Sequence, residues 1–160
     1  MPAWMGVDLG NARVGISLSD PELSVATPLC NVSVWSDYFE ALDDVVDLIA
    51  EHAVTHVVVG YPLNMDGSEG KAAKKARRWS SQLGKRLRQA ENDHPDSAEL
   101  NAVDIELKDE RLTTVSAHRQ LSEAGRGSKK HRQVVDQQSA VLILQSALDQ
   151  TAHQREEGDA

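Results

Sequence analysis

The sequence predicts an α/β fold in which helices flank one mixed sheet. Three short strand-like segments come first, separated by turns, and they predict two antiparallel pairings. Strands and helices then alternate along the chain, which adds parallel strands beside the first one. A length of 160 residues with 40% hydrophobic content suits one domain with one core. We expect that domain to span residues 1–151 and residues 152–160 to form a disordered tail.

The leading strands are marked by turns and by their apolar pattern. Residues 4–9 form an apolar segment typical of a buried strand, and residues 14–19 follow with apolar side chains at alternate positions. A turn at Asp20 and Pro21 separates them from a third strand, which is expected within residues 25–34.

Helices and strands alternate in the rest of the chain. Apolar residues repeat at helical spacing in the longer segments, whereas residues 56–60 form the continuous apolar run of a fully buried parallel strand. The predicted segments are a helix over 37–52, a strand at 56–60, a helix over 71–90, a strand at 103–108, a short helix over 113–123 and a final helix over 132–150.

The chain is acidic overall, but its basic residues are concentrated in two segments. The chain has 17 bases and 25 acids, and its net charge of −8 argues against nucleic-acid binding. However, residues 70–90 hold eight bases and no acid, and residues 126–132 add four bases. Because charges more than about 10 Å away are largely screened, this local basic surface could still meet a phosphate backbone. A solvated helix face is the alternative interpretation for residues 70–90.

Three acids lie where a small domain has little local reason to place a charge. Asp8 interrupts an apolar strand, Glu110 follows the strand at 103–108, and Asp136 shares the apolar face of the last helix. Binding sites in open α/β sheets form beyond the carboxyl ends of parallel strands. Asp8, Gly60 and Glu110 each end a predicted central strand, so we expect them to meet at that edge of the sheet.

Each acid also has a purely structural interpretation. Asp8 could stabilise the turn that follows it. Glu110 or its neighbour Asp109 could favour the start of the next helix. Neighbours on an extended chain point in opposite directions, so only one of these two should reach a given pocket. Asp136 could form a salt bridge with Arg132. The functional hypothesis instead places all three acids around one cation.

Such a cluster of carboxylates would select a hard cation. The expected cofactor is therefore Mg²⁺ or Mn²⁺. Two such ions activate water and stabilise the leaving oxygen of a phosphodiester. The basic stretches could then position the backbone of a nucleic-acid substrate.

Cysteine content and hydropathy bear on the compartment. The single cysteine, Cys30, cannot form an internal disulfide, which fits a reducing cytoplasm. No apolar run approaches the roughly 18 residues that a membrane span needs, and no signal peptide is recognisable. We therefore predict a cytoplasmic location with no membrane association.

Four blocks of the sequence together resemble the YqgF/RuvX family of RNase H-like nucleases. The blocks are residues 8–16, 59–68, 109–114 and 136–145, and their order and spacing cover nearly the whole chain. The resemblance implies an RNase H-like fold whose five strands have the order 3-2-1-4-5, with strand 2 antiparallel to the rest. It implies that the metal-binding, catalytic acids are Asp8, Glu110 and Asp136. It also implies that four bases contact the substrate: Arg13, Lys129, Lys130 and Arg132.

The same resemblance implies hydrolysis of phosphodiester bonds in structured nucleic acid. The substrate would be branched DNA at a Holliday junction or the 5′ end of a ribosomal RNA precursor. A symmetric cut at a junction would need a homodimer. The alternative function is a non-catalytic nucleic-acid-binding adaptor of the same fold; a sugar-kinase or actin-like ATPase would need two such domains. Ser17 and Ser139 stand where the family commonly has Ala, and we expect these to be packing changes.

Overall fold

The computed structural model describes residues 3–10, 13–34, 40–93, 102–111 and 129–158, without the side chains of 91–93, 129–136 and 156–158. The strands are β1 (Ala3–Leu9), β2 (Arg13–Ser19), β3 (Ala26–Ser33), β4 (Val54–Tyr61) and β5 (Asp104–Asp109). The described helices are α1 (Ala41–Glu51), α2 (Lys71–Asp93) and α4 (Lys129–Gly158).

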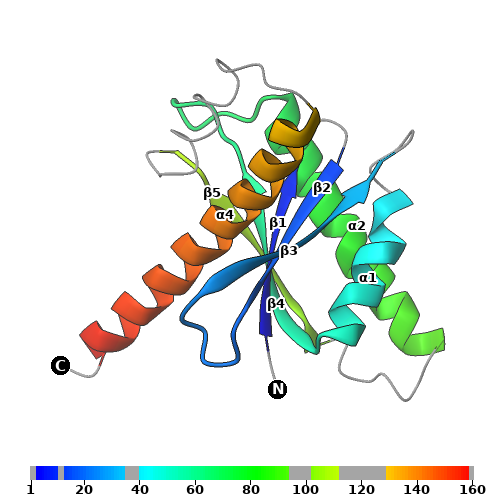
Figure 1. Ribbon diagram of the computed structural model, residues 1–160, viewed down its shortest axis with the longest axis horizontal. Helices are drawn as coiled ribbons and strands as arrows, with labels where there is room; N and C mark the ends of the chain where they lie inside the picture. The colour runs from blue at the N-terminus through cyan, green and yellow to red at the C-terminus, as the bar shows by residue number, and fades with distance from the viewer. Residues whose placement is uncertain (1–2, 11–12, 35–39, 94–101, 112–128, 159–160) are drawn as a thin grey trace.

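The strand order in the sheet is β3-β2-β1-β4-β5, as predicted. β2 is antiparallel to both β1 and β3, whereas β1, β4 and β5 run parallel to one another. β1 therefore occupies the centre. The carboxyl ends of β1, β4 and β5 lie together at one edge of the sheet, the upper edge in Figure 1.

Helices cover both faces of this sheet (Figure 1). On one face, Met5 and Val7 of β1 join a core built around Trp79 of α2, with apolar residues of α1 beside it. On the other face, Ile143 of α4 packs with Val58 of β4. The period-two alternation of each strand thus sends successive side chains into different layers.

The close approach of α4 to the sheet depends on Gly6. A Cβ added to Gly6 would lie 2.6 Å from the carbonyl oxygen of Ala140 and 2.7 Å from Cβ of Leu144, too near for either to stay in place. Beside it, the Ser17 hydroxyl donates a hydrogen bond of 2.8 Å to that same carbonyl oxygen. Ser17 was expected to be a packing change, but it anchors α4 to β2.

The ends of the last helix differ from the prediction. α4 begins at Lys129 and continues to Gly158, so residues 152–158 are helical where a disordered tail was expected. The reason is local: residues 129–157 contain no glycine or proline, and their Gln, Arg and Glu residues are good helix formers even without an apolar face. The short helix predicted over 113–123 lies outside the described residues. Within the described part of the chain, no helix is long and apolar enough to cross a membrane.

Candidate active site

Asp8 lies at the carboxyl end of β1 and faces α4. It is two residues after Gly6, which contacts α4, and alternation puts both on the same side of the strand. Its side chain is buried, with 1% of the residue exposed. The hairpin that follows is closed by backbone groups, because the Gly10 amide donates to the carbonyl oxygens of Asp8 and Arg13.

Gly60 occupies the neighbouring position on β4. Val7 pairs with Val59 in the parallel register of β1 and β4, so the next residues, Asp8 and Gly60, come side by side. Adjacent strands are about 4.8 Å apart. Gly60 also faces α4, since a Cβ added there would lie 2.6 Å from Cδ1 of Ile143. A carboxylate-sized space therefore opens next to Asp8.

The carboxylate of Glu110 fills that space. Its Oε1 is the atom nearest to a Cβ added at Gly60, and Glu110 is buried, with 3% exposed. The backbone amide of Glu110 donates to the carbonyl oxygen of Tyr61, which ties the end of β5 to the end of β4. Two acids separated by about a hundred positions along the chain thus meet on one face of the sheet around a glycine.

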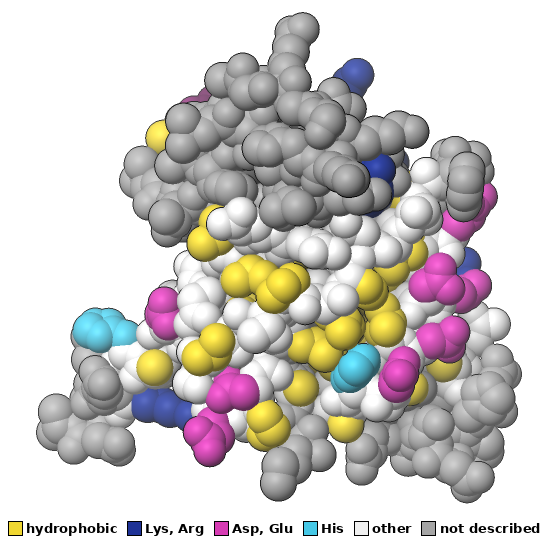
Figure 2. Space-filling view, in the orientation of Figure 1, with side chains coloured by type: hydrophobic (Ala, Val, Ile, Leu, Met, Phe, Trp, Pro, Cys, Tyr) yellow, Lys and Arg dark blue, Asp and Glu magenta, His cyan; other side chains and the backbone are white. Residues whose placement is uncertain are grey.

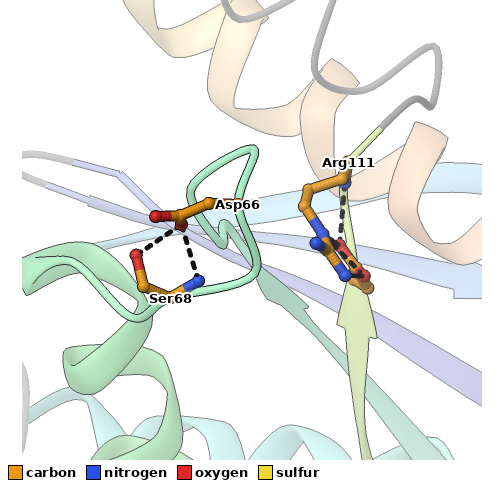
Figure 3. A network of polar contacts seen from close by, with 4 residues as sticks. Asp66, Ser68 and Arg111 are labelled. Carbon is orange, nitrogen blue, oxygen red and sulfur yellow. Dashed lines mark hydrogen bonds and ion pairs between the residues drawn. The ribbon is translucent and has the colours of Figure 1, made fainter.

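Asp109, the neighbour of Glu110, points the other way and has a different role. Its carboxylate accepts hydrogen bonds from the backbone amide of Arg111 at 2.9 Å and from the Arg111 guanidinium at 2.9–3.2 Å (Figure 3). The hydrogen bonds from Arg111 are the main reason that the pKa of Asp109 lies below its ordinary value. The prediction that only one of the two acids reaches the pocket is consistent with this arrangement.

The loop between β4 and α2 lies against the side chain of Arg111. Asp66 accepts hydrogen bonds from the amide and hydroxyl of Ser68, which lower the pKa of its carboxyl group (Figure 3). Gly67 has a φ of 89°, a conformation that favours glycine, and a Cβ there would lie 3.1 Å from a guanidinium nitrogen of Arg111. Arg111 thus sits between the loop and the residue before Glu110.

The other predicted site residues are placed less completely. Arg13 begins β2 and alternates with Gly15, the partner of Asp8 in the antiparallel register, so it lies on the α4 side at the same edge. The remaining four, Asp136, Lys129, Lys130 and Arg132, belong to the N-terminal part of α4, but their side chains are outside the described set. Accordingly, the described residues contain no group of three or more potential metal ligands.

The described part of the site suits a hard cation. Asp8 and Glu110 offer carboxylate oxygens, which Mg²⁺ and Mn²⁺ prefer, and both are held on a rigid sheet and shielded from water. Sequence reasoning placed both acids at this edge of the sheet but missed the contacts of Ser17 and of the Asp109–Arg111 pair. A glycine that ends a buried strand was the available signal for the space that Glu110 occupies.

Comparison with known proteins places the chain in a family. The family model described as RuvX, Holliday junction resolvase, matches residues 2–150. The chain belongs to the RuvX family. A RuvX relative from Bifidobacterium longum, named as a candidate pre-16S rRNA nuclease, is 62% identical over 94% of this chain and 99% of its own length. A relative with the same name from Mycobacteroides abscessus is 37% identical over 97% of this chain and 86% of its own.

Solved structures support the fold. A chain of Thermus thermophilus RuvC, determined in complex with a Holliday junction substrate, superposes with a TM-score of 0.52. The alignment covers 96% of this chain and 97% of the RuvC chain at 12% identity. At that identity the likeness concerns the fold alone, which is the RNase H-like α/β architecture that the sequence predicts for this RuvX protein.

Proposed function

We propose that this protein is a metal-dependent endonuclease that hydrolyses phosphodiester bonds of structured nucleic acid. The observation that carries the proposal is the burial of Asp8 and Glu110 side by side around Gly60. Two buried carboxylates close together repel each other and lose hydration. A divalent cation between them would offset both costs.

Mg²⁺ or Mn²⁺ would be held by Asp8 and Glu110 together with Asp136 from the N-terminal part of α4. When bound, such an ion supplies an activated water and neutralises charge on the scissile phosphate. The two acids would fix the position of the ion because both are buried, one at the end of β1 and one directly after β5. Arg13, at the same edge of the sheet, and a group of bases on α4 would bind the neighbouring phosphates: Lys129, Lys130 and Arg132.

Two candidate substrates are consistent with this chemistry. Relatives up to 63% identical are named as candidate pre-16S rRNA nucleases, which supports an RNA precursor. The description of the family supports a four-way DNA junction. We propose the 16S precursor as the main substrate, with cleavage in the cytoplasm. Symmetric cleavage of a junction would additionally need a homodimer.

The test is a cleavage panel on the full chain with both substrates and with Mg²⁺, Mn²⁺ or no metal. We expect metal-dependent cleavage by the wild type and none by Asp8→Asn or Glu110→Gln, which keep size and hydrogen-bonding capacity but lose the charge. Asp104→Asn, at an exposed acid of β5, is the matched control and should cleave normally. Normal cleavage by Asp8→Asn would remove Asp8 from the mechanism, and binding without cleavage under any metal would favour the adaptor.

A further inference from the structure

A stripe of exposed bases runs along α2, away from the candidate active site. We define the α2 stripe by five exposed residues at spacings of three, four and seven: Lys71, Lys74, Arg78, Lys85 and Arg88. At about 1.5 Å per residue the stripe is about 26 Å long. It lies opposite the buried side of α2, which faces the core through Trp79, Leu83 and Leu87. The stripe therefore points into solvent.

The bases of the α2 stripe are at most weakly compensated by acids of the described residues: Lys74 contributes electrostatically to the lowered pKa of Glu69, behind the hydrogen bond from Tyr61 and the contacts of Arg77. Arg77 and Arg86 on the same helix form ion pairs with Glu69 and Asp43, at 2.9 Å and 2.6 Å. By contrast, no acid among the described residues forms an ion pair with any base of the α2 stripe. The helix itself supplies none, because residues 71–90 contain no Asp or Glu. A helix face that served only solubility would normally mix charges of both signs.

This arrangement is unfavourable for the isolated protein in two ways. Like charges three or four residues apart destabilise a helix, and the stripe contains three such pairs, formed by 71 with 74, 74 with 78 and 85 with 88. The first turn of α2 has no acid and carries Lys71 and Lys74 at the positive end of the helix dipole. An anionic partner along the stripe would relieve both effects.

The position of α2 relates the stripe to the candidate site. α2 begins directly after the loop that follows β4, and Figure 1 shows its start at the edge of the sheet where the carboxyl ends of β1, β4 and β5 lie. From there it runs along the face of the sheet opposite α4. Figure 2 views the α4 side, and the residues coloured there include only scattered dark-blue bases among acidic and apolar side chains. A ligand that leaves the site over the β4–α2 loop would meet Lys71 first.

We propose that the α2 stripe binds the phosphate backbone of a helical arm of the substrate, while another part of the same molecule occupies the candidate site. The stripe covers roughly seven to eight base pairs at the 3.4 Å spacing of double-stranded DNA. This deepens the proposed function, since it assigns the substrate a bent or branched shape that passes over the edge of the sheet. It rests on nucleic acid being the ligand, but not on cleavage.

The experiment compares two double variants of the full chain that remove the same charge from the same helix. Lys74→Gln/Arg78→Gln removes two bases of the stripe, and Arg77→Gln/Arg86→Gln removes the two bases that already pair with acids. Gln is about as good a helix former as Lys or Arg, so α2 should persist. Binding is measured without divalent metal over a range of salt concentrations. The probes are an RNA duplex and a DNA duplex longer than the stripe, and a four-way DNA junction.

For the stripe variant we expect the slope of log affinity against log salt to fall by about 1.8, which is about 0.9 for each lost phosphate contact. The paired-base variant should change the slope by less than half of that. A loss seen with one type of duplex alone would assign the stripe to that nucleic acid. Equal slopes for the two variants, or wild-type binding by the stripe variant, would overturn the proposal.

Thermal unfolding adds an independent readout. Without nucleic acid, the stripe variant should have the same Tm as the wild type or a higher one, because like-charge repulsion is reduced; a clearly lower Tm would overturn the argument that the stripe is unfavourable alone. The two proposals also fail separately. Stripe-dependent binding without cleavage under any metal would reject the nuclease, whereas cleavage with unaltered binding by the stripe variant would reject the stripe.

Discussion

Replacing Gly60 with alanine should reduce cleavage strongly while leaving the protein folded. The added Cβ would lie 2.6 Å from Cδ1 of Ile143 and nearer still to Oε1 of Glu110, whereas ordinary van der Waals contacts begin at 3.4 Å. Both atoms are ends of side chains that can rotate, so the structure can adapt. The Glu110 carboxylate must then move by roughly 1 Å, and a displacement of that size in a reacting group costs about 100-fold in rate.

The expected effect on stability of Gly60→Ala is much smaller. Overpacking of this kind costs about 1–3 kcal/mol. Replacing a glycine inside a strand returns about 0.5–1 kcal/mol through lower backbone entropy of the unfolded chain. The free energy of unfolding should therefore fall by roughly 0–2.5 kcal/mol, which leaves a protein of ordinary stability folded.

The assay pairs metal-dependent cleavage with urea denaturation, and Gly84→Ala is the matched control. A Cβ at Gly84 would meet its nearest atoms at 3.7 Å, an ordinary distance, so this substitution in α2 should keep full activity. It should also stabilise the helix by about 1 kcal/mol. Wild-type cleavage by a folded Gly60→Ala variant would refute the reasoning, because Glu110 would then not need the position over Gly60.

Three further predictions test other contacts: two substitutions and one titration. Ser17→Ala should lower the free energy of unfolding by only about 1 kcal/mol, measured by denaturation, because the carbonyl of Ala140 keeps its bond within α4; a loss above about 3 kcal/mol would indicate a larger role for that hydroxyl. The pKa of Asp20 is lowered to about 2, chiefly by the hydroxyl of Ser24, so its NMR titration should be centred near that value. Since the folded pKa lies below the unfolded one, the stabilisation from Asp20 is present above pH 3.8 and lost as the pH falls towards 2; an ordinary titration midpoint would contradict this. Arg111→Gln should reduce the turnover rate more than substrate binding by loosening the chain around Glu110, and an unchanged rate would show that the ion pair is dispensable.

Most of the strands could be predicted because each has a recognisable hydrophobic pattern in its own sequence. The turns and the alternation at 14–19 predicted antiparallel pairings among the first three strands, and the apolar run at 56–60 predicted a parallel strand; the full order, which the sheet has, was implied by the family resemblance. The end of α4 was predicted too early, since apolar periodicity stops near residue 150 while helix propensity continues to Gly158. Periodicity reports burial, and an exposed helical extension does not carry that signal.

The sequence predicted that Asp8 and Glu110 meet at one edge of the sheet, but it did not predict the contacts around them. Asp8 and Glu110 stood out because a charge inside an apolar strand, or directly after one, is costly without a partner. Ser17 did not stand out, because a small polar residue on a strand reveals nothing of a helix that lies more than a hundred residues farther along the chain. The Asp109–Arg111 pair was also hidden, since its meaning depends on where the β4–α2 loop folds back.

The central claim is that Asp8 and Glu110 share one divalent cation beside Gly60. The most direct measurement is paramagnetic broadening of backbone amide signals by Mn²⁺ in the wild type and in Asp8→Asn/Glu110→Gln. In the wild type, the amide signal of Gly60 should broaden at low Mn²⁺ concentration, well before that of Gly84 on α2. The double variant should lose this early broadening. Equal broadening of Gly60 in both proteins would contradict the account, because the ion would then bind without the two carboxylates.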